Sequence, residues 1–283
     1  MVTRALAAAK SVKHAGFVAS KNLRRAALET SSSAKIRWGS FRFDPSRYPS
    51  HRFLGHSAAQ GESRPVPRRV FVLWTGRNAM PAVRVHSLRR LEDSLGVPME
   101  LVTPDDLPRW ILPEHPLHPG YELLSLTHRS DYLRAYLLHH HGGGYTDVKQ
   151  PTASWGPVFN VLAAREDLWM AGYPEDSTGR VPRLGGSLER DLRLRFSDLV
   201  GTGAFVARPA TPLTAEWLRE VERRLDYFMD LLEVAPGGVR DEAPGYVVGW
   251  TQILADVLYP LMLKYRGRIH RTDALLPSFV DYR

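Results

Sequence analysis

The sequence of 283 residues contains no cysteine, which excludes disulfide bonds, thiolate metal ligands and a cysteine nucleophile. It also lacks any uninterrupted apolar run near the roughly 20 residues that a membrane-spanning helix needs. We therefore expect a protein that is not integral to a bilayer, and the absence of cysteine suits a reducing, cytoplasmic location. A hydrophobic content of 43% with 24% charged residues is ordinary for a globular protein, so we expect one large domain with an appendage.

Acidic residues are scarce near the amino terminus. Residues 1–69 hold 14 Lys and Arg against 3 Asp and Glu, whereas the rest of the chain holds 24 against 27. The formal net charge of +8 therefore belongs to the amino-terminal part and not to the main domain. We predict a basic arm and linker over residues 1–67 and a single main domain over residues 68–283.

The arm itself has two interpretations. Residues 1–30 are rich in alanine and carry spaced basic residues, namely Lys10, Lys13, Lys21, Arg24 and Arg25. This pattern is compatible with a basic helix that lies on the inner surface of an anionic membrane. It is also compatible with a solvated arm, because alanine offers little area to bury. We do not expect nucleic-acid binding, since regularly interleaved aromatic residues are missing. Residues 31–69 are predicted to form a linker or a loop that wraps the domain.

The main domain opens with a pattern typical of an α/β fold. The run from Arg69 to Gly76 is short, apolar and ended by glycine, as in a buried parallel strand. A helix is predicted over about residues 81–95, with Gly96 after it, and a second strand over residues 99–102. This order predicts a right-handed βαβ unit, and such sheets bind ligands at the carboxyl ends of their strands.

Further elements follow from periodicity. Apolar residues at helical spacing predict a helix over residues 127–141, with Thr127 as a plausible cap, and a long helix over residues 214–232. Short strands are predicted at residues 145–148 and 203–207, and a last helix at residues 250–265.

The stretch from Gly179 to Leu199 is rich in Arg, Gly and Pro, and includes Asp191, Arg193 and Arg195. We interpret it as a mobile loop that closes over a ligand.

Two pairs of charged residues draw attention to the centre of the chain. Asp131 and Arg134 are three residues apart and therefore project from one side of the predicted helix. Asp147 and Lys149 lie on one face of the following strand, if that strand alternates with a period of two. The glycines that start at Gly142 let the backbone approach a ligand closely. We predict that these four side chains face one cleft.

The sequence from Ser130 through Asp131 and Arg134, followed by Gly142-Gly143-Gly144-Tyr145-Thr146-Asp147, resembles a known motif. It is similar to the signature of glycosyltransferases with a DxD sugar-binding region, which include enzymes of capsular polysaccharide synthesis and initiating mannosyltransferase-like proteins. Weaker likenesses occur around residues 74–76, 201–207 and 249–251. The resemblance implies a GT-A fold, a Rossmann-type mixed α/β sheet flanked by helices.

The resemblance also implies roles for individual residues. It assigns the nucleotide pocket to Trp74, Thr75 and Gly76, and the ribose or sugar to Asp131 and Arg134. The donor-binding loop would include Gly143, Gly144 and Tyr145. Asp147 would be the first acid of the DxD pair, and the donor a UDP- or GDP-sugar.

This chain departs from the family pattern where the second acid is expected, because Lys149 stands there. Three outcomes stay open. Lys149 can replace the metal ion and neutralise the donor pyrophosphate. A divalent cation, manganese or magnesium, can still bind through Asp147, the donor phosphates and a late ligand such as His270 or Asp273. Otherwise the site has lost catalysis and only binds.

The resemblance implies transfer of a sugar to a glycan or another hydroxyl acceptor with retention of anomeric configuration. The departing phosphate then helps to deprotonate the acceptor, so a separate base is not required. If the protein supplied one, Asp198 or Asp241 would be candidates. The alternative is a non-catalytic protein that binds a nucleotide-sugar or a polyanion.

Overall fold

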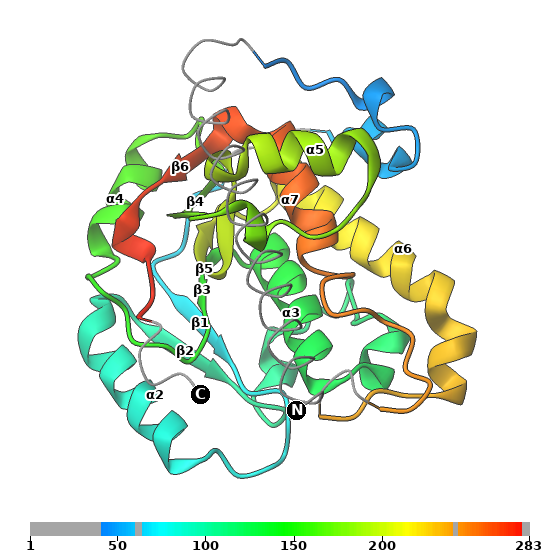
Figure 1. Ribbon diagram of the computed structural model, residues 1–283. Helices are drawn as coiled ribbons and strands as arrows, with labels where there is room; N and C mark the ends of the chain where they lie inside the picture. The colour runs from blue at the N-terminus through cyan, green and yellow to red at the C-terminus, as the bar shows by residue number, and fades with distance from the viewer. Residues whose placement is uncertain (1–40, 60–63, 240–242, 279–283) are drawn as a thin grey trace, which may run out of the picture.

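The computed structural model describes residues 41–59, 64–239 and 243–278. Within them the predicted α/β fold is confirmed: a mixed six-stranded sheet is flanked by helices (Figure 1). The strands are β1 (Val70–Leu73), β2 (Met99–Val102), β3 (Gly143–Thr146), β4 (Met170–Pro174), β5 (Val200–Ala207) and β6 (Ile269–Arg271). The helices are α2 (Ala82–Leu95), α3 (Leu126–His140), α4 (Gly156–Ala164), α5 (Gly186–Leu194), α6 (Pro212–Val234) and α7 (Ala255–Lys264).

The strand order is β2-β1-β3-β5-β4-β6. Strand β1 pairs in parallel with β2 and β3, β5 is antiparallel to both β3 and β4, and β4 pairs in parallel with β6. Every strand except β5 therefore points the same way. The carboxyl ends of β1, β3 and β4 meet the amino end of β5 at one edge of the sheet, which is where ligands bind in such folds.

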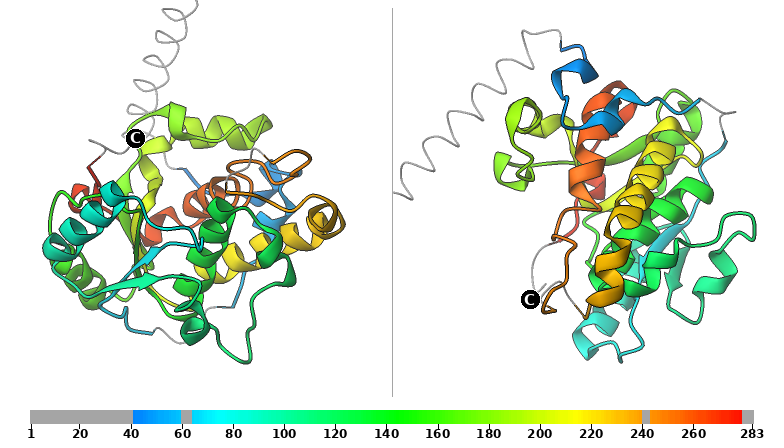
Figure 2. Two further views of the ribbon diagram at one scale, coloured as in Figure 1. Left: turned by 90° about the horizontal axis from the view of Figure 1, so that it is seen from below. Right: turned by 90° about the vertical axis from the view of Figure 1, so that its right-hand side faces the viewer.

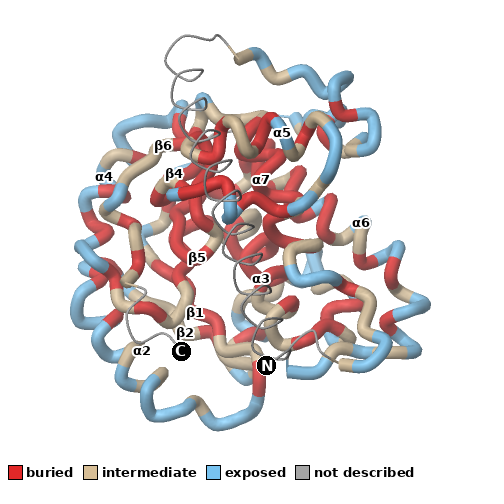
Figure 3. Tube along the Cα trace, viewed as in Figure 1, coloured by how far each residue is buried: buried red, intermediate tan, exposed pale blue. Residues whose placement is uncertain are grey.

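Each face of the sheet has its own hydrophobic core, because successive side chains of a strand point to opposite faces. Phe71 and Leu73 belong to the core beneath α3, α6 and α7, whereas Val70 and Val72 belong to the core beneath α2 and α4. Figures 1 and 2 show the two helical layers on either side of the sheet. Figure 3 shows that burial is concentrated in the strands and in the helix faces that cover them.

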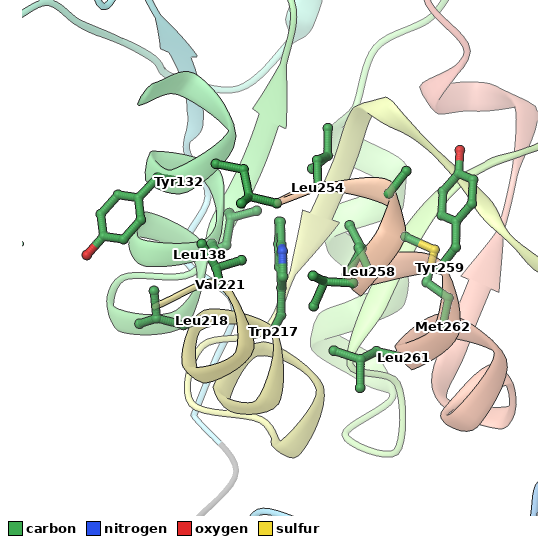
Figure 4. Close-up of a cluster of buried hydrophobic side chains, with 14 of the residues drawn as sticks. Tyr132, Leu138, Trp217, Leu218, Val221, Leu254, Leu258, Tyr259, Leu261 and Met262 are labelled. Atoms are coloured by element: carbon green, nitrogen blue, oxygen red, sulfur yellow. The ribbon is translucent and has the colours of Figure 1, made fainter. Parts of the chain in front are cut away.

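The core on the α3 side is centred on Trp217 of α6, which is fully buried. Figure 4 shows Trp217 between Leu138 of α3 and Leu258 of α7. This large apolar contact fixes α3 against the sheet. It therefore fixes the position of any functional side chain that α3 carries.

Helix α3 agrees with the predicted helix, but its cap differs. The side chain of Ser125, and not that of Thr127, accepts a hydrogen bond from the backbone amide of His128. The helix thus begins one residue earlier than predicted. Helix α6 is likewise longer than predicted, because Thr211 and Thr214 form a reciprocal capping box at its start.

The prediction of a mobile loop over residues 179–199 is wrong. Nine of these residues form α5, whose Leu188 and Leu192 are buried one helical turn apart. Asp191 of this helix is also buried, and its carboxylate accepts a hydrogen bond from the Tyr48 hydroxyl at 2.9 Å. The high glycine and arginine content of the segment led to the prediction of a loop in place of this short amphipathic helix.

The described part of the segment before residue 68 packs on the domain, as the loop interpretation predicted. Residues 41–59 contain two short 3-10 turns, Pro45–Arg47 and Arg52–Gly55, and they bury Tyr48 and Leu54. The predicted basic helix within residues 1–30 lies outside the described residues. No helix in the part of the chain that the structure describes is both long and apolar enough to cross a lipid bilayer.

The bounds of other elements also differ from the predicted ones. Helix α7 begins at Ala255, five residues later than the predicted start of the last helix, because residues 250–254 form turns. Strands β4 and β6 and helix α4 were not predicted at all. Strand β3 starts at Gly143, so two of the three glycines that were expected to end α3 belong to the sheet.

Candidate functional site

The four predicted charged residues lie together at the carboxyl edge of β3. Arg134 lies between two carboxylates, with its Nη2 atom 3.2 Å from Asp131 Oδ1 and 3.7 Å from Asp147 Oδ1. The Nζ atom of Lys149 is 2.8 Å from Asp147 Oδ2. The Asp131, Arg134 and Lys149 residues are buried, and the Asp147 side chain keeps 20% of its surface exposed. Two acids and two cations thus form one network that is open to solvent only at Asp147.

Helix α3 holds its half of the network rigidly. Asp131 and Arg134 are adjacent on the buried side of the helix because residues three apart share a face. The guanidinium of Arg134 also donates to the backbone oxygen of Thr202 on β5 at 3.1 Å. This bond fastens the helix to the amino end of β5.

A tight turn, and not strand alternation, brings Lys149 to Asp147. Strand β3 ends at Thr146, and the amide of Lys149 donates to the backbone oxygen of Asp147 at 2.6 Å. The amide of Asp147 in turn donates to the oxygen of Gly203 at 2.8 Å. The predicted proximity of the two side chains is correct, but its structural reason was not.

Tyr145 supports the network from beneath. Its hydroxyl donates to Asp147 Oδ1 at 2.7 Å, and its ring lies 4.3 Å from the Arg134 guanidinium carbon. The Tyr145 residue is only 3% exposed. The side chain therefore orients Asp147 and Arg134 and offers little surface to a ligand.

The carboxyl groups of Asp131 and Asp147 have different pKa values because their surroundings differ. Burial raises the pKa of Asp131 from 3.8 to about 6, against the opposing charge of Arg134. Burial also acts on Asp147, but the charges of Arg134 and Lys149 outweigh it and lower the pKa of that carboxyl group. Two carboxylates with divergent acidity in one network are typical of a functional site.

Gly203 of β5 is buried and packs against the Asp147 network. A Cβ atom at this glycine would lie 3.1 Å from Asp147 Oδ2, 3.5 Å from the Tyr173 hydroxyl and 3.6 Å from Lys149 Nζ. A carboxylate, a phenol and an ammonium thus surround one point. The missing Cβ atom lets these three groups pack closely against β5.

Sequence reasoning missed the neighbouring residues at the end of β4. Burial raises the pKa of Tyr173, and the charges of Glu175 and Asp147 raise it further. Glu175 is buried and accepts a hydrogen bond from the Tyr259 hydroxyl. Burial raises the pKa of Glu175 as well. The short apolar run Met170-Ala171-Gly172-Tyr173 was the one sequence signal for a strand here.

The predicted nucleotide-pocket residues follow β1 at the same edge of the sheet. The Trp74 indole donates to the backbone oxygen of Asn78 at 2.9 Å, and the Thr75 hydroxyl donates to that of Leu126 at 2.6 Å. A Cβ atom on Gly76 would clash with Leu126. These contacts tie the loop after β1 to the start of α3.

Gly143 and Gly144 lie at the amino end of β3, away from Asp147. Gly143 has a φ of +109°, and a Cβ atom there would lie 2.8 Å from the backbone oxygen of Arg69. At Gly144 a Cβ atom would lie 2.9 Å from the Trp155 ring. Packing within the protein accounts for both glycines, since protein atoms fill the space that they leave.

The structure does not bring the proposed late metal ligands to the network. His270 lies on β6, and strands β5 and β4 separate β6 from β3. Asp273 follows that same edge strand. Among the described residues, no three His, Cys, Asp or Glu side chains form a group that could hold a metal ion. A hard cation prefers several oxygen ligands, and an ammonium already lies 2.8 Å from Asp147 Oδ2, so this donor set fits a divalent cation poorly.

The two candidate bases have other positions. Asp198 lies within 4 Å of three guanidinium groups, those of Arg195, Arg266 and Arg271. It therefore joins the turn after α5 to the segment 266–271. Asp241 lies outside the described residues.

Cavities occur elsewhere on the molecule. One of about 820 Å³ lies between residues 49–56 and α6, and a second of about 340 Å³ lies on the other side of Arg219. Neither is lined by a residue of the Asp147 network. We place the candidate site at the network because its perturbed carboxyl groups lie at the carboxyl edge of the sheet, where the fold predicts a ligand.

Comparison with known proteins adds little. No protein-family model matches the sequence, and no curated protein matches it. Among solved structures, a chain described as "PaToxG Glycosyltransferase" matches with 10% sequence identity and a TM-score of 0.33. The match covers 86% of this chain and 88% of that chain. A likeness at this TM-score carries no weight for the activity of this chain.

Proposed function

We propose that this chain is a glycosyltransferase that moves a sugar from a nucleotide-sugar donor to a hydroxyl acceptor. The observation that carries the proposal is the buried network around Asp147, with Lys149 paired to it and Arg134 between the two carboxylates. The donor would meet these groups at Asp147, whose side chain keeps 20% of its surface exposed.

Lys149 and Arg134 supply the positive charge that a donor diphosphate needs. In the absence of a donor, Asp147 neutralises Lys149 and shares Arg134 with Asp131. A phosphate oxygen that enters beside Lys149 can replace the carboxylate as the partner of its ammonium. Asp147 would keep the hydrogen bond from Tyr145 and the charge of Arg134, so it would stay ionised.

In the proposed reaction, negative charge develops on the diphosphate as it leaves the sugar. The bond between the anomeric carbon and the diphosphate oxygen breaks, and a bond to the acceptor oxygen forms on the same face of the sugar. The acceptor proton passes to the departing phosphate. Fixed cations lower the energy of this step because they are already oriented where negative charge grows.

Asp131 is 2% exposed, so it would act on the donor through Arg134, whose Nη2 atom lies 3.2 Å from its carboxylate. With a pKa of about 6, Asp131 is mostly ionised at neutral pH and holds the Arg134 guanidinium in place. The resemblance of the Asp131 and Arg134 motif to sugar-binding motifs agrees with this role.

The position of Lys149 supports the metal-independent form of the proposal. A divalent cation at Asp147 would have to approach an ammonium that lies 2.8 Å from one of the carboxylate oxygens. Like charges at such a distance repel strongly in a site that is largely shielded from water. Lys149 therefore takes over the charge-neutralising role that a metal ion has in the resembling enzymes.

One observation favours a second function. The network is electrically balanced without a ligand, because each of the two carboxylates already has a cationic partner. Such a balanced network also suits a protein that binds a nucleotide-sugar and does not turn it over. This non-catalytic module predicts binding without release of the nucleotide.

The test measures nucleotide release from UDP- and GDP-sugars, with manganese or with a chelator. We expect release that persists in the chelator and is abolished by Asp147→Ala. Gly203→Ala should reduce kcat/KM at least about tenfold, because its methyl group would lie 3.1 Å from Asp147 Oδ2 and would shift this carboxylate relative to Lys149.

Gly267→Ala is the matched control, since nothing lies within 4 Å of a Cβ atom there. Binding of these donors without release would support the non-catalytic module. If the chain neither binds nor turns over any of these donors, both functions are contradicted.

A further inference from the structure

The cavity of about 820 Å³ beside α6 has an unusual lining. Four arginines, Arg52, Arg219, Arg223 and Arg224, line it together with His51 and His56. The acidic residue among its lining residues is Glu220. Its volume falls within the range of small-molecule sites, about 300–1,000 Å³.

Glu220 holds two of the arginines in place. Its residue is 2% exposed, and its carboxylate accepts two hydrogen bonds from Arg223, at 2.7 and 2.8 Å, and one from Arg224 Nε at 2.9 Å. Arg224 also donates to the backbone oxygen of Gln252. These bonds fix two guanidinium groups before any ligand arrives, which lowers the entropy cost of binding.

The positive charge that lines this cavity exceeds the negative charge of Glu220. One buried carboxylate needs one cation, whereas four guanidinium groups line the cavity. Lys264 does not alter the excess, because it pairs with the buried Glu216 at 2.7 Å. Arg52 and Arg219 are exposed and contribute positive charge beyond the Glu220 group.

We propose that this cavity, between residues 49–56 and α6, is a second binding site, for a small ligand that carries several phosphate groups. Guanidinium groups match the geometry of phosphate oxygens through paired N–H donors, and several of them converge here. The imidazole of His51 adds a hydrogen-bonding group at the wall. The site is separate from the Asp147 network and does not depend on the proposed transferase activity.

Titration calorimetry of the full chain with inorganic tripolyphosphate, at about 150 mM salt, tests the proposal. We expect saturable binding that the double variant Arg52→Ala/Arg219→Ala weakens at least tenfold. Both side chains are exposed, so this variant should keep the thermal unfolding temperature of the wild type. Citrate, which has similar charge but no phosphate, should bind more weakly.

Two further variants make the outcome specific. Arg89→Ala/Arg90→Ala removes the same charge from an exposed part of α2 and should leave the affinity unchanged. In Lys149→Met, the binding that the Arg52/Arg219 variant weakens should persist, because Lys149 does not line the cavity. The proposal is overturned if the wild type does not bind tripolyphosphate. It is equally overturned if the Arg52/Arg219 variant binds as the wild type does, which would assign the anion to the basic arm or to the Asp147 network.

Discussion

Lys149 gives the candidate site its particular chemistry. The side chain is buried with the rest of the network, and its ammonium contacts Asp147 directly. A lysine that is only a solvated strand residue would not be held in this way. The ion pair keeps Asp147 charged and holds a cation next to this partly exposed carboxylate.

Replacing this lysine by an acid should change the metal requirement. Lys149→Asp places two carboxylates in one turn, and their mutual repulsion favours binding of a divalent cation. We expect nucleotide release by the variant to become dependent on manganese, whereas wild-type release persists in a chelator. Lys149→Met should lower release at least about tenfold under both conditions. If nucleotide release by Lys149→Asp does not depend on manganese, the role given to Lys149 is contradicted.

Asp131 should make folding stability depend on pH. Its folded pKa of about 6 exceeds the ordinary 3.8, so the folded state binds more protons between these values and loses stability as pH rises. The asparagine variant lacks this loss. The stability of Asp131→Asn relative to the wild type should therefore increase from pH 4 to pH 7, by on the order of 2–3 kcal/mol. Urea unfolding at the two pH values measures it, and a constant difference would refute the assignment.

At the scale of elements, the long helix α6 organises one side of the molecule. Its inner face carries Trp217 and Val221 into the core, and its outer face lines the arginine-rich cavity. The start of the helix is fixed by Thr211, whose hydroxyl accepts from the Thr214 amide at 3.3 Å. The cap thus adds to the core contacts that hold this helix in place.

Loss of this cap should destabilise the fold measurably. Thr211→Ala removes the hydroxyl from a buried capping box, and we expect a loss of about 1–2 kcal/mol in the free energy of unfolding. Thr211→Ser keeps the hydroxyl and should lose less than half of that. Denaturant unfolding with unchanged m values measures both. Equal losses in the two variants would show that the methyl group, and not the cap, is responsible.

At the scale of the whole molecule, the segment 41–59 belongs to the folded domain. Leu54 is 1% exposed within the core beneath α6 and α7, and Arg47 pairs with Asp191 of α5 at 2.8 Å. The predicted boundary at residue 68 therefore separates residues that pack together. The same segment forms one wall of the arginine-rich cavity.

Truncation of the Leu54 side chain tests whether the segment 41–59 is part of the folded domain. Leu54→Ala leaves a cavity in the core and should cost about 2–5 kcal/mol of unfolding free energy. Val83→Ala, at a residue that is 61% exposed on α2, should cost less than about 0.5 kcal/mol. A Leu54 variant as stable as the wild type would mean that the segment contributes nothing to the fold.

Local patterns predicted a substantial part of this architecture. The strands β1 and β2 and the helices α2, α3 and α6 were foreseen because their apolar spacing is a property of neighbouring residues. The elements β4, α5 and β6 were not, because glycine, proline and charged residues interrupt their short apolar patterns. Packing against distant segments stabilises them instead.

The sequence by itself determined that Asp131 and Arg134 share one helical face, because helix geometry relates residues three apart. It also determined that Asp147 and Lys149 lie near each other, because only one residue separates them. Only the tertiary structure decided that Arg134 bridges both acids and that the Tyr173 hydroxyl packs beside the same network. It also brought Glu175 to Tyr259, 84 positions along the chain. Such contacts depend on strand order and helix packing, which no local spacing encodes.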